Sequence, residues 1–294
     1  MTDSIAARIH SLATRAKTAP PLVMLTAYDA ISARIVDDVG VDLILVGDSA
    51  ANTVLGYSTT REISVDELLM LTRAARRGVR SALLVGDLPF GTYESNDEQA
   101  VATARRFVEA GCDLVKLEGA SKMLSRVAAI IAAGIPVMGH VGLLPQGAET
   151  VAALRARGRT ANDAISVVCD AIALADAGCS ILVVEAVPSV VAAAIVERVS
   201  IPVIGIGAGS NVGGQVLVLP DLLGLGDGPA PKFVQTYART RESWIDAIQR
   251  FSADVRSRSF PVRSHEYGMP APEVAAFQAL LVADSPLGGL KGAG

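Results

Sequence analysis

Ionisable side chains stand at the ends of five consecutive apolar runs in this sequence. In chain order these groups are Asp48 with Ser49, then Asp87, then Lys116 and Glu118, then His140, and finally Glu185. A single Asp at such a position often only caps a helix or forms a turn. The repetition over five runs indicates one shared site.

Lys116 and Glu118 are two residues apart, so on a strand both side chains point to the same face. Buried charges of this kind must be paired, hydrated or bound to a metal, because an isolated buried charge costs several kcal/mol. A simple Lys116–Glu118 ion pair is the alternative to a functional role.

Three of these groups form an all-oxygen carboxylate set on neighbouring runs: Asp48, Asp87 and Glu118. Hard oxygen ligands suit Mg²⁺, which keeps several waters and leaves positions open for substrate. No His/Cys cluster in the sequence indicates structural zinc. We therefore expect a magnesium site.

Two further groups have open interpretations. His140 stands between glycines in "GHVG", which suits close approach by a ligand, but a single His is equally often a hydrogen-bonded core residue. Glu185 stands in the apolar run "VVEAV", where burial raises the pKa of a carboxyl group toward that of a useful general base. The alternative for Glu185 is a charge paired with a neighbouring Lys or Arg.

A glycine-rich run, "GIGAGSNVGG", covers Gly205–Gly214. It lacks a full G-x-G-x-x-G in register, so it is a weak nucleotide signal. Glycines at a strand end also allow an anionic group or a ring to approach.

The elements that must position these groups are short buried strands alternating with amphipathic helices. The predicted strands are Leu22–Ala27, Leu43–Gly47, Ala82–Gly86, Leu114–Leu117, Pro136–Gly139, Ile181–Val184, Pro202–Ile206 and Val216–Leu219. The predicted helices between them are Ala30–Val39, Val65–Arg77, Asp97–Ala110, Lys122–Ala133, Asn162–Ala177 and Ser189–Val199. Five of these helices are followed by a glycine, at Gly40, Gly78, Gly111, Gly134 and Gly178, where a left-handed backbone is expected.

Eight such units predict an α/β protein, a single (β/α)₈ barrel over about residues 20–225. In such barrels the residues at the C-terminal ends of the strands carry the chemistry. A doubly wound open sheet is the alternative, although the sequence shows no topological switch point. Long insertions follow the second strand (Asn52–Ser64) and the fifth (Gly142–Thr160), and the second of these is expected to form a lid. A helical extension is predicted at about 226–284, with helices at Arg241–Val255 and Pro272–Val282, followed by a flexible tail at 285–294.

Composition excludes several classes of protein. With 26 basic against 30 acidic residues the net charge is −4, which gives no support for nucleic-acid binding. The apolar stretches are broken by Gly and Pro, the N-terminus lacks a signal-peptide pattern, and three sparse cysteines indicate a reducing compartment. A cytoplasmic protein without membrane spans is expected.

At its candidate site residues the sequence resembles the ketopantoate hydroxymethyltransferase family, also named 3-methyl-2-oxobutanoate hydroxymethyltransferases. The resemblance covers about residues 20–268. It rests on eight motifs in order: "TAYDA" (26–30), "LVGDS" (45–49), "DLPFGTY" (87–93), "VKLEG" (115–119), "GHVGLLPQ" (139–146), "VVEAVP" (183–188), "IPVIGIGAG" (201–209) and "PKF" (231–233).

The resemblance implies roles for these residues. The family's metal-binding positions fall on Asp48, Asp87 and Glu118, and its oxo-acid contacts fall on Asp48, Ser49, Asp87 and Lys116. Its proton-abstracting base falls on Glu185 and its active-site histidine on His140. The family is usually assembled as a decamer, which implies a homo-oligomer.

The departures from the family pattern lie outside these positions. Leu144 stands where the family usually has Thr, residues 152–159 read "AALRARGR" where a "GGFKVQGR"-like segment is usual, and 70–72 read "MLT" where "YHT" is usual. A "DGQ…HD" pattern of the family appears here as Gly213-Gly214-Gln215 with Pro220-Asp221. These differences concern the lid, the folate contacts and the assembly.

The resemblance implies Mg²⁺-dependent transfer of a hydroxymethyl group from 5,10-methylenetetrahydrofolate to 3-methyl-2-oxobutanoate, the first step of pantothenate biosynthesis. One alternative is a Mg²⁺-dependent lyase or decarboxylase of a small 2-oxo or 2-hydroxy acid. Such lyases typically carry an active-site Cys, and none of the three cysteines follows a predicted strand. The other alternative is a divergent paralogue, either without catalysis or acting on a different oxo acid.

Overall fold

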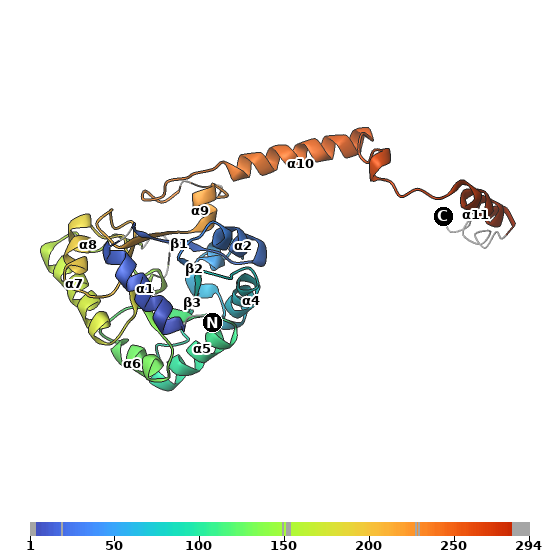
Figure 1. Cartoon of the computed structure of the whole chain (residues 1–294). Coiled ribbons are helices and arrows are strands. Elements are labelled where there is room, and N and C mark those ends of the chain that lie inside the picture. The colour runs from blue at the N-terminus through green and yellow to red at the C-terminus, as the bar shows by residue number, and fades with distance from the viewer. Residues whose placement is uncertain are drawn as a thin grey trace. The chain divides into compact units, whose positions relative to one another are not determined.

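The structure is a computed structural model that describes residues 4–18, 20–148, 150, 154–226, 228 and 230–283. These residues divide into two units, one ending at Thr240 and the other beginning at Arg241 (Figure 1). The tail predicted at 285–294 lies outside the described residues. Each unit is described by itself.

The first unit is a closed barrel of eight parallel strands, each hydrogen-bonded to the next in chain order, with β8 pairing with β1. The strands are β1 (Leu22–Thr26), β2 (Leu43–Val46), β3 (Leu83–Asp87), β4 (Leu114–Glu118), β5 (Val137–Gly142), β6 (Ile181–Glu185), β7 (Val203–Ile206) and β8 (Gly214–Leu217). The predicted barrel is confirmed, and the open doubly wound sheet is wrong because the sheet has no free edge.

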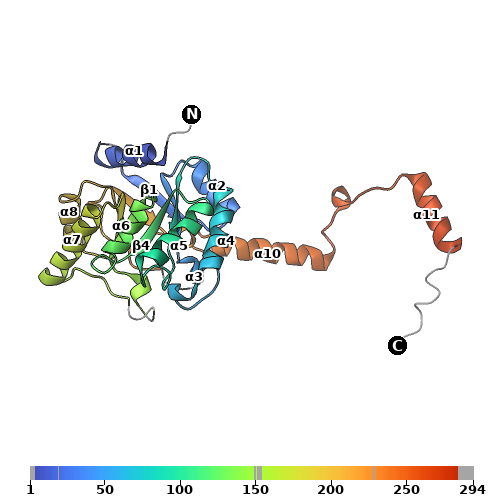
Figure 2. The same cartoon turned by 90° about the horizontal axis from the view of Figure 1, so that it is seen from below.

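Helices cover the outside of this barrel (Figures 1 and 2). A helix of at least eight residues follows each of the first six strands: α2 (Ala30–Asp38), α4 (Val65–Arg76), α5 (Asp97–Glu109), α6 (Leu124–Ala132), α7 (Ala161–Asp176) and α8 (Ser189–Val196). Polar side chains cap several of them; Asp29 accepts hydrogen bonds from the backbone of Ile31 and Ser32, and Asn96 from that of Gln99. Residues 207–213, between β7 and β8, contain no helix, as predicted.

Three helices were not predicted: α1 (Ile5–Thr18), α3 (Ala50–Thr53) and α9 (Leu219–Leu223). Single 3₁₀ turns occur at Thr60–Glu62 and Pro145–Gly147. Helix α1 lies across one end of the barrel in both views, and its Leu12 packs into the apolar cluster inside the barrel (Figure 2). It therefore closes the end at which the strands begin.

The barrel interior follows the two-residue period of the strands. Leu83 and Val85 of β3 point inward, as do Leu114 of β4 and Met138 of β5. Continuing the same period places Asp87, Lys116 and Glu118, His140, and Glu185 on the inner face as well. The predicted common face of Lys116 and Glu118 follows from this alternation.

The glycines after the helices only partly follow the prediction. Gly40, Gly111, Gly134 and Gly178 have the expected positive φ, but Gly78 does not. A Cβ at Gly78 would lie 2.5 Å from the carbonyl oxygen of Ala30, so this glycine is required by close packing of the α4 end on α2.

Residues after β8 stay with the barrel as far as Thr240. The backbone N–H of Tyr237 donates to the carbonyl of Leu222 in α9, and the Phe233 ring packs on Gly207. The second unit contains α10 (Thr240–Ser257) and α11 (Ala271–Ala283), close to the predicted helices. None of its residues between 241 and 281 is buried.

Candidate functional site

The predicted site residues come together at the C-terminal mouth of the barrel. Because β3 to β6 are consecutive neighbours, the register pairs Asp87 with Lys116, Glu118 with His140, and Gly142 with Glu185. Together with Asp48 and Ser49, these polar side chains line one cavity of about 180 Å³.

Lys116 lies between Asp87 and Glu118 and contacts both. Its Nζ lies 2.8 Å from Asp87 Oδ1 and 2.9 Å from Asp87 Oδ2, and 3.8 Å from Glu118 Oε1. The backbone N–H of Asp48 donates to Asp87 Oδ2 at 3.2 Å. All four residues are buried. Lys116 therefore pairs mainly with Asp87, and the isolated Lys116–Glu118 ion pair considered from sequence is not the main contact.

Burial and the neighbouring charges shift the pKa values of the groups in this cluster. Burial disfavours the charged lysine, but Asp87, Glu118 and Asp48 outweigh burial and raise the pKa of Lys116. Burial raises the pKa of Asp48 well above its usual range, and the negative charge of Asp87 adds to this effect. Burial likewise raises the pKa of Asp87, against the attraction of Lys116. The site is therefore short of positive charge around its two aspartates.

His140 lies between two carboxylates. Its Nδ1 is 3.3 Å from Glu118 Oε1, and its Nε2 is 3.3 Å from Glu185 Oε2. Burial and Lys116 oppose a charged imidazole, but the two carboxylates outweigh both and raise the pKa of His140 to about 9. His140 is thus a charged group in contact with both Glu118 and Glu185. The partner of Glu185 among the described residues is this histidine rather than a Lys or Arg.

Glu185 is the least enclosed of the acidic groups. Its side chain is 16% exposed, whereas that of Glu118 is 4% exposed. Its position at the end of β6 places it on the wall of the cavity that also contains Lys116 and Asp48. A carboxylate open to a cavity on one side and held by His140 on the other can accept a proton from a bound molecule.

Gln146 is a buried member of the site for which the sequence analysis predicted no role. Its Nε2 donates to Asp48 Oδ2 at 3.1 Å and to the Leu88 carbonyl at 3.0 Å, and its backbone N–H donates to Glu118 Oε2 at 3.0 Å. The Tyr93 hydroxyl donates to Gln146 Oε1 at 2.7 Å. The loop after β5 therefore reaches back over the carboxylates.

Ser49 lies at the same mouth, at the start of α3. Its hydroxyl is 2.8 Å from that of Tyr28, whose pKa burial raises to about 12, so Tyr28 stays protonated. Ser49 and Tyr28 form a neutral hydrogen-bonding edge of the cavity.

The donor chemistry fits a divalent cation at Asp48 and Asp87. Two buried carboxylates whose pKa values are raised by burial, with Lys116 as the cation in direct contact, leave negative charge for a metal to neutralise, and Mg²⁺ commonly binds through one or two carboxylates plus water. Among the described residues, no group of three His, Cys, Asp or Glu side chains converges on one point. Glu118 stands apart because His140 and the Gln146 backbone engage its two oxygens.

Comparison with known proteins identifies the family. The model of the ketopantoate hydroxymethyltransferase family matches residues 6–263. A 3-methyl-2-oxobutanoate hydroxymethyltransferase of Oleidesulfovibrio alaskensis is 48% identical over 88% of this chain and 90% of that protein. The enzyme of the same name from Acidothermus cellulolyticus is 46% identical over 88% of this chain and 96% of that protein.

Solved structures at low identity share the fold. A phosphonopyruvate hydrolase in complex with oxalate and Mg²⁺ superposes with a TM-score of 0.60 at 14% identity, over 98% of this chain and all of that one. A 2,3-dimethylmalate lyase superposes with a TM-score of 0.55 at 13% identity, over 93% and 99% of the two chains. The family model and the close relatives decide the assignment: the chain belongs to the ketopantoate hydroxymethyltransferase family.

Proposed function

We propose that this protein transfers a hydroxymethyl group from 5,10-methylenetetrahydrofolate to 3-methyl-2-oxobutanoate, giving 2-dehydropantoate in the first step of pantothenate biosynthesis. Family membership supports this reaction. The structural observation that carries it is the continuous series of contacts from Glu185 through His140, Glu118 and Lys116 to Asp87 at the barrel mouth.

Asp48 and Asp87 are the proposed direct ligands of Mg²⁺, with Glu118 contributing through water. Bound there, the ion supplies positive charge that polarises the keto oxygen of the substrate. The binding of Glu118 to His140 and Gln146 is the reason for its indirect role.

Lys116 and Ser49 are proposed to hold the carboxylate of the oxo acid. Lys116 stays charged because its pKa is raised, and it lines the same cavity as Ser49. A fixed ammonium and a hydroxyl give the substrate carboxylate one orientation.

Glu185 is the proposed base that takes the C3 proton. The contact with His140 fixes the position of the Glu185 carboxylate beside the cavity, which a base requires. C3 then forms a bond to the one-carbon unit, both carbon–nitrogen bonds of that unit break, and one water supplies the hydroxyl oxygen. The two folate nitrogens receive one proton from C3 and one from this water.

The lyase alternative receives no support from the cysteines. Cys112 and Cys179 are buried just before β4 and β6, and Cys169 lies in α7. All three are away from the mouth, so no cysteine stands ready for the role that such lyases give to an active-site thiol.

The protein is further proposed to act as a cytoplasmic homo-oligomer, with a decamer expected from the family. Helix α10 exposes Trp244, Ile248 and Phe251, each more than half exposed. Such an apolar face on a helix without any buried residue is typical of a surface that packs against another copy. No helix among the described residues is long and apolar enough to cross a membrane.

A turnover assay tests the proposed reaction. With Mg²⁺ and 5,10-methylenetetrahydrofolate, 3-methyl-2-oxobutanoate should give 2-dehydropantoate, followed by proton NMR. Pyruvate and 2-oxobutanoate serve as competing acceptors. Turnover of one of these alone, or cleavage of an oxo acid without folate, would contradict the proposal.

A further inference from the structure

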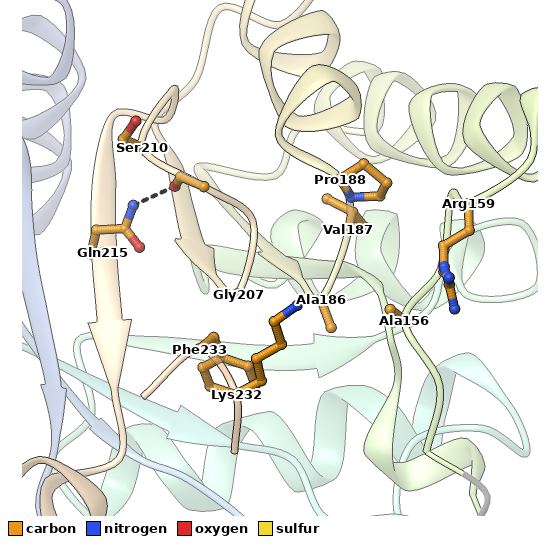
Figure 3. A pocket seen from close by; sticks show the side chains of 11 residues that line it. Ala156, Arg159, Ala186, Val187, Pro188, Gly207, Ser210, Gln215, Lys232 and Phe233 are labelled. Atoms are coloured by element: carbon orange, nitrogen blue, oxygen red, sulfur yellow. Dashed lines mark hydrogen bonds between the residues drawn. The ribbon is translucent and has the colours of Figure 1, made fainter. Parts of the chain in front are cut away.

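A second and larger cavity adjoins the catalytic one. It has a volume of about 650 Å³, and Phe233 lines both cavities. Its walls come from the loop after β6, the loop after β7, Gln215 of β8, and the segments 156–159 and 232–233 (Figure 3). A molecule that reacts beside Glu185 can therefore extend past Phe233 into this space.

The cavity is apolar with two positive charges. Its apolar lining consists of Ala156, Ala186, Val187, Pro188 and Phe233, and no acidic residue lines it within the described part of the chain. Lys232 extends across the cavity beside the Phe233 ring, and Arg159 lies on the opposite side (Figure 3).

Neither cation has a partner among the residues that the structure describes. Arg159 and Lys232 make no hydrogen bond or ion pair with any described residue, whereas nearby Arg157 is held by Asp163 at 2.6 Å. Two unpaired cations facing one apolar cavity create a site for an anionic ligand. Gln215, which also lines the cavity, differs from the two cations because its side-chain amide donates a hydrogen bond to the Gly209 carbonyl.

The glycine-rich run shapes this cavity. Gly207 has a φ of +63°, and a Cβ there would lie 2.8 Å from the Phe233 ring. The ring that Gly207 admits is thus Phe233 itself, which lies where the two cavities meet. The contact with Phe233 therefore explains Gly207 in the run Gly205–Gly214 without a bound nucleotide.

We propose that this cavity binds the p-aminobenzoylglutamate part of the folate, with the benzoyl ring on the apolar wall and the glutamate carboxylates at Arg159 and Lys232. The inference rests on the proposed function, which requires a folate whose one-carbon unit reaches the catalytic mouth. Its volume lies in the range of ligand-binding pockets, and its two charges match two carboxylates.

If the glutamate of the folate binds Arg159 and Lys232, replacing either cation should weaken only the binding of ligands that carry the glutamate. We would measure the dissociation constants of tetrahydrofolate and of tetrahydropteroate, which lacks the glutamate, by fluorescence titration. Arg159→Ala and Lys232→Ala should each weaken tetrahydrofolate binding about tenfold, as expected for loss of a charge-assisted hydrogen bond. Tetrahydropteroate binding should change less than twofold. Added salt should weaken tetrahydrofolate binding to the wild type more than binding to either variant.

Arg198→Ala is the matched control, because it removes an exposed arginine that follows α8, away from the cavity. It should leave both dissociation constants unchanged. Equal losses for the two ligands in Arg159→Ala and Lys232→Ala, or no loss at all, would overturn the assignment. Because binding is measured without turnover, a wild type that binds tetrahydrofolate in this pattern but forms no product would contradict the proposed function alone.

Discussion

At the scale of single residues, Gln146 shows how the site holds its charges in place. One side-chain amide serves Asp48, the Leu88 carbonyl and the Tyr93 hydroxyl, while the same residue's backbone serves Glu118. A buried polar group left without its partner is destabilising, so removing this amide affects several groups at once.

Gln146→Leu should therefore lower the free energy of unfolding by about 2–4 kcal/mol. It should also reduce kcat, because Asp48 loses the hydrogen bond that orients it. Urea denaturation checks stability, and Gln249→Leu on exposed α10 is the control, with an expected change within about 0.5 kcal/mol. An unfolding free energy unchanged in both variants would contradict the role of Gln146.

The metal proposal is also tested at one residue. Adding Mg²⁺ should raise the Tm of the wild type, because a ligand that binds only the folded state stabilises it. Asp87→Asn should show no such rise and no turnover, while the exposed Asp38→Asn should behave as wild type. The same Mg²⁺-dependent rise in Asp87→Asn would remove Asp87 from the site.

Residue types at strand ends could be predicted from the sequence because barrel strands have a strict two-residue period. Asp87, Lys116, Glu118, His140 and Glu185 all follow it. Gln146 and Tyr93 could not, since both lie in loops whose course depends on contacts distant in sequence. The quoted motifs contain both residues, but nothing in their types or spacing distinguishes them from ordinary loop residues.

At the scale of elements, close backbone packing sets the position of Glu185. Leu143 N–H donates to the Glu185 carbonyl at 2.9 Å, just after Gly142. Gly142 has a φ of +96°, and a Cβ there would lie 2.3 Å from that carbonyl oxygen. The end of β5 can lie this close to β6 only because position 142 has no side chain.

Gly142→Ala should therefore shift the end of β6 and lower kcat at least tenfold, with a loss of stability. Gly147→Ala lies in the same loop, where a Cβ would meet nothing within 4 Å, and should be nearly neutral. The pair is compared by kcat and by thermal unfolding. Similar kcat values for the two variants would show that the close contact does not position Glu185.

The cap of α2 gives a pH-dependent prediction. Burial opposes ionisation of Asp29, but hydrogen bonds from Ser32 and Ile31 outweigh it and lower the pKa of Asp29 below its usual 3.8. Because the folded-state pKa is the lower one, the stabilisation is present above pH 3.8 and is lost as the pH falls through the folded-state value.

Asp29→Ala should lower the free energy of unfolding by roughly 0.5–1 kcal/mol at pH 7. This value is at the low end for a helix cap because the Asp29 side chain is exposed to solvent. The difference in unfolding free energy between wild type and Asp29→Ala should become smaller as the pH falls below 3.8. Urea titrations at several pH values measure it. Asp29→Asn keeps a capping oxygen that does not titrate, so its stability relative to Asp29→Ala should not depend on this pH range. A constant difference between wild type and Asp29→Ala would contradict the assignment.

The helices that the sequence did not predict were missed for two physical reasons. α3 and α9 have four and five residues, too short for a periodic pattern. The apolar side chains of α1, Ile9, Leu12 and Ala16, find partners only once the barrel has closed beneath them. Long alternating segments were predictable because each one carries its own pattern.

At the scale of the whole molecule, the described residues of the second unit form no core of their own. Its residues 241–281 include no buried side chain, while α11 exposes Phe277, Leu280 and Leu281. Isolated helices of this length gain most of their stability from packing, so this unit is expected to be ordered by another copy of the chain.

Placing a charge on the exposed apolar face of α10 should break that assembly. Phe251→Asp should reduce the mass found by sedimentation velocity, while Arg256→Glu, an equally exposed change on the same helix, should not. An unchanged assembly in Phe251→Asp, or a wild type that is already a monomer, would contradict the proposed homo-oligomer.

In the proposed reaction, Glu185 removes the C3 proton before folate takes part. In D₂O with Mg²⁺ and no folate, the wild type should exchange the C3 hydrogen of 3-methyl-2-oxobutanoate, as followed by proton NMR. Glu185→Gln keeps the shape of the side chain but removes the base, so exchange should fall by at least ~10²-fold, whereas exposed Glu197→Gln should exchange as wild type. Exchange in Glu185→Gln at the wild-type rate, or no exchange in a wild type that forms product with folate, would contradict the account.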